Sequence, residues 1–160
     1  MKQGREEGYP PWYTQEMKDH KRPCELSHII ECDEEHRDQY RNKVEFTIGR
    51  TYKDNSICVG FNVGNPSKGI TFVDYPDGIK TNSVESVKVA KQVQDLVIAS
   101  GVEPYDKRIN QGYWRLLLFR ESKRTNQVLI SVIVTESFMI EAEKQKWIED
   151  QLTDMFKEGT

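Results

Sequence analysis

The stretch Val44-Glu45-Phe46-Thr47-Ile48 alternates apolar and polar side chains. This period of two is typical of a β-strand with one buried face. A polar turn at 54–56 follows, and a second apolar run occupies 57–63. We therefore predict a first β-hairpin from strands 44–48 and 57–63, with a third strand at 70–73.

A second hairpin is predicted near the end of the chain. The run YWRLLLFR at 113–120 and the run at 128–134 flank a basic turn at 121–126. The second run is apolar and rich in β-branched residues. This composition favours a central strand covered on both faces.

Helices are predicted between and beside these strands. A short one at 12–21 lies in the polar N-terminal part, and Asn82 or Ser83 caps a longer one that ends at Gly101. Its apolar face is formed by Val87, Val89, Ala90, Val93, Leu96 and Val97. Ser137 caps a last helix, whose apolar face comprises Ile140, Trp147, Ile148, Leu152, Met155 and Phe156.

These elements predict an α+β fold: a mainly antiparallel sheet of two hairpins packed against two amphipathic helices. Residues 1–37 are expected to form a tail and a helical lead-in, and residues 38–160 a single α+β domain. Three cysteines without close pairing favour thiols in a reducing compartment. No run approaches the about 20 apolar residues of a membrane span. We therefore expect an intracellular protein without a membrane partner.

The sequence carries no autonomous active site. Residues 64–71 have the glycine spacing of a phosphate-binding loop, but Ile70 replaces the required lysine, which favours a strand-connecting loop. His20, His28 and His36 lack metal-ligand spacing and are expected on the surface. We predict no catalytic residue, no metal site and no cofactor site in this segment.

Two segments combine cations with aromatic rings in a chain whose net charge is −3. One is YRNKVEF at 40–46, and the other is the hairpin region 107–124. Such basic strands with interleaved aromatic residues are typical of proteins that bind looped or single-stranded RNA. The alternative is structural, because alternating charges are often a solvated face and Trp114 is more often core than platform.

The run Tyr40-Arg41-Asn42-Lys43-Val44-Glu45-Phe46-Thr47-Ile48-Gly49 resembles the YRNK-x-EF-x-x-G signature of the eukaryotic tRNA (uracil-5-)-methyltransferases. The resemblance continues through Pro11-Trp12 and HKRPC at 20–24 upstream. Downstream it includes Gly60, Gly64, Gly69 and Pro76, and then the strand GYWR at 112–115 with Arg120. The resemblance covers most of the chain from Trp12 to Phe156.

The resemblance implies a parent enzyme that uses S-adenosylmethionine to methylate C5 of a T-loop uridine in tRNA. In that family a cysteine thiolate attacks C6 of the flipped-out uracil and a carboxylate acts as the base. These groups lie in a C-terminal catalytic domain, which is absent from this chain, so Cys24, Cys32 and Cys58 are not assigned as nucleophiles. This segment is then the central RNA-binding region, whose partners are the tRNA T-arm and its own methyltransferase domain.

The residues predicted to contact RNA are Tyr40, Arg41, Asn42, Lys43, Tyr113, Trp114, Arg115 and Arg120. The cations are assigned to the phosphate backbone, and the aromatic rings and Asn42 to loop bases. Glu45 and Phe46 are either RNA-binding or structural. A second hypothesis makes the segment a scaffold that docks on the methyltransferase domain without RNA affinity of its own. A third makes it a stand-alone protein-interaction module.

Overall fold

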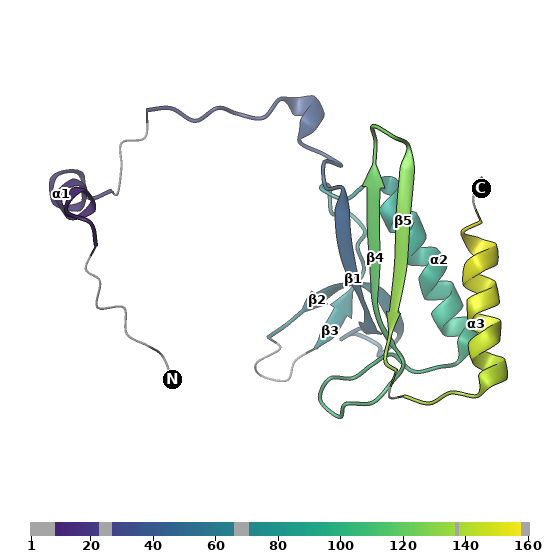
Figure 1. The fold of residues 1–160 in the computed structure, drawn as a ribbon. Helices are drawn as coiled ribbons and strands as arrows, with labels where there is room; N and C mark the ends of the chain where they lie inside the picture. The colour runs from purple at the N-terminus through teal and green to yellow at the C-terminus, as the bar shows by residue number, and fades with distance from the viewer. Residues whose placement is uncertain (1–8, 23–26, 66–70, 137, 158–160) are drawn as a thin grey trace. The chain divides into compact units, whose positions relative to one another are not determined.

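The protein is described by a computed structural model that covers residues 9–22, 27–65, 71–136 and 138–157 (Figure 1). The chain divides into two compact units, 1–33 and 34–160. In the first unit, helix α1 runs from Pro11 to His20, close to its predicted bounds, and buries none of its residues. No helix in the described ranges is long and apolar enough to cross a membrane.

The second unit is an antiparallel sheet covered by helices on one face. Its elements are η1 (Glu34–His36), β1 (Lys43–Arg50), β2 (Ile57–Val63), β3 (Phe72–Asp74), α2 (Val84–Ser100), β4 (Trp114–Ser122), β5 (Gln127–Val134) and α3 (Ala142–Met155). The strand order is β3-β2-β1-β4-β5, and every neighbouring pair is antiparallel. Figure 1 shows α2 and α3 side by side against the sheet. The predicted α+β class with its two hairpins is confirmed.

Strand β1 lies at the centre of this sheet and follows its sequence pattern. Val44, Phe46 and Ile48 are at most 1% exposed, whereas Lys43 and Glu45 point to the opposite face. The register pairs Val44 with Phe119 and Phe46 with Leu117, so two strands contribute adjacent side chains to one core. The alternation therefore predicted correctly which face of β1 is buried.

Helix α2 begins and ends where its caps predict. The Ser83 hydroxyl accepts a hydrogen bond from the backbone N–H of Ser86 at 3.2 Å, and Gly101 adopts the left-handed conformation at φ 63°. Its buried positions are Ser86, Val89, Ala90, Val93, Leu96, Val97 and Ser100. The predicted apolar face is the face that packs on the sheet, although Val87 is only partly buried.

Helix α3 differs from its prediction in two respects. It begins at Ala142, with Glu141 at the N-cap position, whereas the predicted cap Ser137 lies outside the described residues. Ile148 is 2% exposed and packs in the core with Leu152 beside it, but Trp147 is 38% exposed. Trp147 is rotated away because the helix contacts the core along a narrow stripe only.

The predicted central position of the last strand is wrong. β5 is an edge strand that pairs with β4 alone. Leu129 and Ile133, on the face away from the helices, are 57% and 40% exposed. A continuous apolar run predicts a β-strand but does not predict whether the strand has one neighbour or two. The position of β5 in the sheet is therefore known only from the tertiary structure.

Strands β2 and β3 approach each other closely at Gly60. A Cβ atom at this position would lie 2.0 Å from the backbone oxygen of Asp74. Strand β3 runs from Phe72 to Asp74, whereas the strand was predicted at 70–73, and Ile70 lies outside the described residues. Glycine is required at position 60 because any side chain there would collide with the backbone of β3.

Candidate nucleic-acid interface

The predicted RNA-binding residues separate into two groups. The β1 cluster comprises Tyr40, Arg41, Asn42, Lys43 and Arg120, because the register places Lys43 directly opposite Arg120. The β4 cluster comprises Tyr113, Trp114 and Arg115, at the other end of β4. Arg115 and Arg120 are five residue steps apart along the strand, a span of about 17 Å. The fold therefore places the eight residues in two separate groups and not in one continuous cluster.

Backbone hydrogen bonds hold the β1 cluster in place from two sides. On one side, Asn42 accepts from the N–H of Glu121 at 2.9 Å. On the other side, the N–H of Arg41 donates to the oxygen of Thr81 at 3.1 Å. The segment 39–42 is thus attached both to the end of β4 and to the residues that precede α2, while its side chains stay exposed.

Two further lysines join the β1 cluster. Lys123 donates from Nζ to the backbone oxygen of Gln39 at 2.8 Å, and Gln39 donates to the oxygen of Lys80 at 2.7 Å. Lys123 belongs to the basic hairpin that the sequence singled out. Lys80 was missed, because about 40 residues separate it from the motif and no local pattern links the two segments.

The outer face of β1 carries an exposed ion pair. Lys43 Nζ lies 2.9 Å from Glu45 Oε1, and both side chains are about half exposed, at 52% and 53%. The hydrogen bond and the charge of Lys43 lower the pKa of the Glu45 carboxyl. Because exposed pairs add little stability, the chief effect of Glu45 is to neutralise part of the charge of Lys43.

The β4 cluster is largely built into the core. Trp114 has no exposed surface, and its indole Nε1 donates to the Ser100 hydroxyl at 3.3 Å. Tyr113 is 8% exposed and packs edge-on against Trp114. The Trp114 ring, which was predicted to stack on RNA bases, has no exposed face in this structure, so it is placed as a core residue. Tyr113 likewise has little surface to offer.

Arg115 is the exposed member of the β4 cluster. A register irregularity between Trp114 and Leu116 turns this residue outward. Its guanidinium carbon lies 4.9 Å from the ring centroid of Tyr105, a cation–π arrangement. Arg115 is thus positioned by a loop residue and not by the β1 cluster.

The structure places Glu45 and Phe46 on opposite faces of β1, so the two residues are assigned separately. Phe46 is completely buried, with its ring 5.3 Å from that of Phe61, so it is structural. Glu45 stays on the exposed face beside Lys43. Tyr40 is 65% exposed and is the aromatic ring of the β1 cluster that has a free face.

The cysteines and histidines give no sign of a reactive centre in the described part of the chain. Burial, with Asp74 and Asp77 nearby, raises the pKa of the Cys58 thiol to about 11, so it is protonated at neutral pH. Cys24 lies outside the described residues, and Cys32 is exposed. Among the residues with described positions, no three His, Cys, Asp or Glu side chains gather as metal ligands.

Comparison with known proteins identifies similar sequences. The zinc finger CCCH domain-containing protein 24 of Arabidopsis thaliana is 30% identical over 101 residues, covering 63% of this chain and 12% of that protein. The tRNA (uracil-5-)-methyltransferase homolog A of Homo sapiens is 25% identical over 122 residues, covering 76% of this chain and 19% of that protein. The chain is related to RNA methyltransferases. This relationship is the one that the YRNK-x-EF signature predicted.

The methyltransferase relatives are much longer than this chain, which spans about a fifth of human homolog A. No protein-family profile matches the sequence. Among solved structures, the Pyrococcus abyssi tRNA (uracil-54, C5)-methyltransferase in complex with S-adenosyl-L-homocysteine aligns with a TM-score of 0.49 at 18% identity. That alignment covers 69% of this chain and 24% of the Pyrococcus chain.

Proposed function

We propose that this chain is the RNA-binding domain of a tRNA (uracil-5-)-methyltransferase, which recognises the T-arm and presents the T-loop uridine for C5 methylation. The observation that carries this proposal is the β1 cluster. Lys43 and Arg120 face each other across the sheet, with Arg41, Lys80 and Lys123 around them, in a chain of net charge −3.

The chemistry of the β1 cluster fits an RNA backbone with unpaired bases. Arginine and lysine bind phosphate oxygens and release counterions, which supplies affinity without base specificity. The exposed ring of Tyr40 offers a stacking face, which single-stranded or looped RNA can use and a regular duplex cannot. A stem followed by a loop, as in the T-arm, presents both features together.

Methyl transfer itself is assigned to another part of the parent enzyme. There S-adenosylmethionine supplies the methyl group, and a cysteine thiolate activates the uracil by attack at C6. Cys58 cannot take this role, because its thiol is buried and its pKa is raised. The part proposed for this domain is to hold the RNA so that the uridine reaches that catalytic site.

The experiment is a fluorescence titration of the chain with a T-arm hairpin and with a plain duplex, each at two salt concentrations. We expect tighter binding to the hairpin and a steep loss of affinity with salt. The double variant Arg41→Ala/Arg120→Ala should lower the salt slope by about two units, one for each phosphate contact. Lys146→Ala removes an exposed cation of α3 and serves as the matched control. Equal binding to hairpin and duplex, or no effect of the double variant, would contradict the proposal.

A second candidate function is docking on the methyltransferase domain. It is favoured by the exposed apolar side chains Leu129 and Ile133 on the uncovered side of edge strand β5. Such a surface suits a protein partner better than a phosphate backbone. Adding the separately expressed methyltransferase domain discriminates between the two: docking predicts tight association that Leu129→Asp abolishes, without RNA affinity in this chain.

A further inference from the structure

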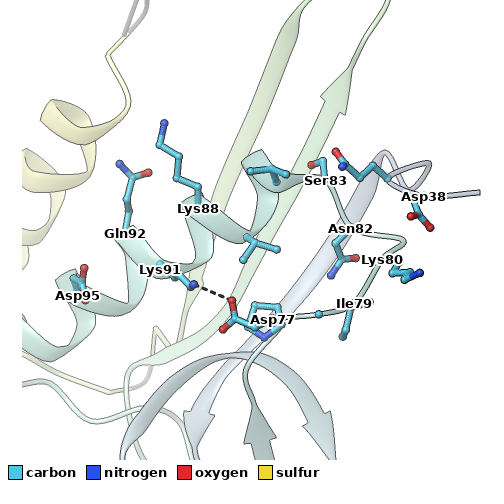
Figure 2. A pocket seen from close by; sticks show the side chains of 15 residues that line it. Asp38, Asp77, Ile79, Lys80, Asn82, Ser83, Lys88, Lys91, Gln92 and Asp95 are labelled. Carbon is cyan, nitrogen blue, oxygen red and sulfur yellow. Dashed lines mark ion pairs between the residues drawn. The ribbon is translucent and has the colours of Figure 1, made fainter. Parts of the chain in front are cut away.

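A groove lies beside the β1 cluster, between the turn at 76–80 and the first turns of α2 (Figure 2). Its volume is about 580 Å³. Gln39 forms part of its wall, and the backbone N–H of Gln39 donates to the oxygen of Lys80, which lines the groove as well. The residue that directly precedes the family signature therefore borders this groove.

Asn82 lines the groove with a side chain that has no partner. The residue is 4% exposed, and neither its amide nitrogen nor its amide oxygen has a hydrogen-bond partner in the described structure. Its backbone is well held, since its N–H donates to the oxygen of Ile79 at 3.1 Å. Buried amides are almost always hydrogen-bonded, so this one offers a donor and an acceptor to a bound group.

The remaining lining of the groove suits a flat apolar ring with polar edges. Ile79 and Val84 are 40% and 68% exposed and form apolar walls. Lys91 is engaged by Asp77 at 2.8 Å, as the dashed line in Figure 2 marks, and Lys88 by Glu85 at 3.6 Å, so Lys80 is the lysine of the groove without an ion pair among the described residues. Helix α2 also begins here, and a helix N-terminus favours a phosphate group.

We propose that this groove binds one unpaired nucleotide of RNA, with its base against Ile79 and Val84 and its hydrogen-bonding edge on the Asn82 amide. This inference rests on the proposed function and explains how the same surface would distinguish an RNA loop, which has unpaired nucleotides, from a regular duplex. A carboxamide places a donor beside an acceptor, and the edges of nucleobases offer the complementary pair.

The Asn82 amide is closed to solvent in this structure. Each of the two amide atoms exposes less than 1 Å². A Cβ atom built on Gly78 would meet no heavy atom within 4 Å, so this turn has open space beside it. A base therefore reaches the Asn82 amide only after a local shift of the groove wall, and the turn at Gly78 has room for one.

The test uses uridine 5′-monophosphate and adenosine 5′-monophosphate, titrated separately into the ¹⁵N-labelled chain. We expect saturable shifts of the Asn82 side-chain amide and the Val84 backbone amide with at least one of the two. Asn82→Leu should weaken that binding about tenfold, as expected when two hydrogen bonds are lost. Asn62→Leu, at an exposed asparagine of β2, is the matched control and should bind as the unchanged chain does. No saturable shift, or undiminished binding by Asn82→Leu, would overturn the inference.

A second variant guards against a folding defect in Asn82→Leu. Val84→Glu places a carboxylate on an exposed wall of the groove, where it should leave folding intact and repel the phosphate. Both variants should weaken T-arm hairpin binding while leaving the affinity for a plain duplex unchanged. If hairpin binding depends on Arg120 but on neither Asn82 nor Val84, the groove proposal fails and the proposed function stands. If the monophosphates bind at Asn82 but no hairpin binds, the groove proposal stands and the proposed function fails.

Discussion

Lys43 of β1 and Arg120 of β4 are directly paired across the sheet, so two cations face each other on its outer surface. Like charges in this position oppose folding. Glu45 lies 2.9 Å from Lys43, while no carboxylate of the described residues forms an ion pair with Arg120. The Arg120 guanidinium is therefore exposed and has no ion pair among the described residues, which is compatible with the proposed binding of RNA phosphates.

The first prediction concerns this pair. Arg120→Gln should weaken T-arm binding and lower the salt slope by about one unit, because one phosphate contact is lost. Its effect on stability should be neutral or slightly favourable. Arg115→Gln is the matched control, since Arg115 lies on the same strand but is held over Tyr105. A larger effect of Arg115→Gln in the same titration would place the RNA interface at the Arg115 end of β4 and contradict this prediction.

The second prediction concerns Glu45. Glu45→Gln removes the negative charge beside Lys43 and should tighten RNA binding about two- to threefold, in line with the small energies of exposed pairs. The gain should shrink as salt is raised, because the effect is electrostatic. Titration of both proteins at low and high salt measures it. Weaker binding by Glu45→Gln would show instead that the carboxylate accepts hydrogen bonds from bases.

The third prediction compares two aromatic residues. Trp114→Ala should lower the free energy of unfolding by about 3–5 kcal/mol, because Trp114 fills the core. The milder Trp114→Phe should fold and keep its RNA affinity. Tyr40→Ala should do the reverse: unchanged stability, within about 0.5 kcal/mol, and hairpin binding weakened by about 1–3 kcal/mol. Urea unfolding and hairpin titration of each variant measure both quantities. If Trp114→Phe folds but loses RNA affinity, Trp114 takes part in RNA binding and this prediction is contradicted.

The fourth prediction concerns two glycines. Gly60→Ala should destabilise the domain by about 3 kcal/mol, because its Cβ would meet the Asp74 backbone oxygen, which cannot move without opening the β2–β3 pair. Gly78→Ala has space for the Cβ but keeps a positive φ of 79°, so its cost should be about 1–2 kcal/mol. Urea unfolding ranks the two. An equal loss of unfolding free energy in the two variants would mean that the β3 backbone at Asp74 shifts to accommodate the Cβ of Gly60→Ala.

The fifth prediction concerns acid stability. The pKa of the Asp54 carboxyl is lowered to about 2 from an ordinary value of 3.8, chiefly because the Thr51 hydroxyl and then Ser56 donate hydrogen bonds to it. A carboxyl whose pKa is lower in the folded state stabilises the fold above about pH 4. That contribution is lost as the pH falls toward 2.

The measurement is the urea midpoint between pH 5 and pH 2, in the unchanged chain and in Asp54→Asn. We expect a flatter loss of stability in Asp54→Asn, because its amide does not titrate. Thr51→Val removes the first donor and should move the loss of stability to higher pH. Parallel curves for the unchanged chain and Asp54→Asn would show that this turn does not contribute to acid unfolding.

The sequence by itself determined the local elements of this protein. The alternation at 44–48 predicted which face of β1 is buried, and Ser83 and Gly101 predicted the ends of α2. These features depend on neighbours within a few residues, where side-chain period and cap chemistry act directly. The YRNK-x-EF signature likewise pointed to the RNA methyltransferases through residues that are contiguous in the chain.

Only the tertiary structure decided which of these residues meet. The strand order made β5 an edge, and the register joined Lys43 to Arg120 while it left Arg115 about 17 Å away. Packing against α2 buried Trp114, and the contact between residue 39 and residue 80 added Lys80 and the Asn82 groove. Pairing between segments tens of residues apart depends on the free energy of the whole core, which no local pattern encodes.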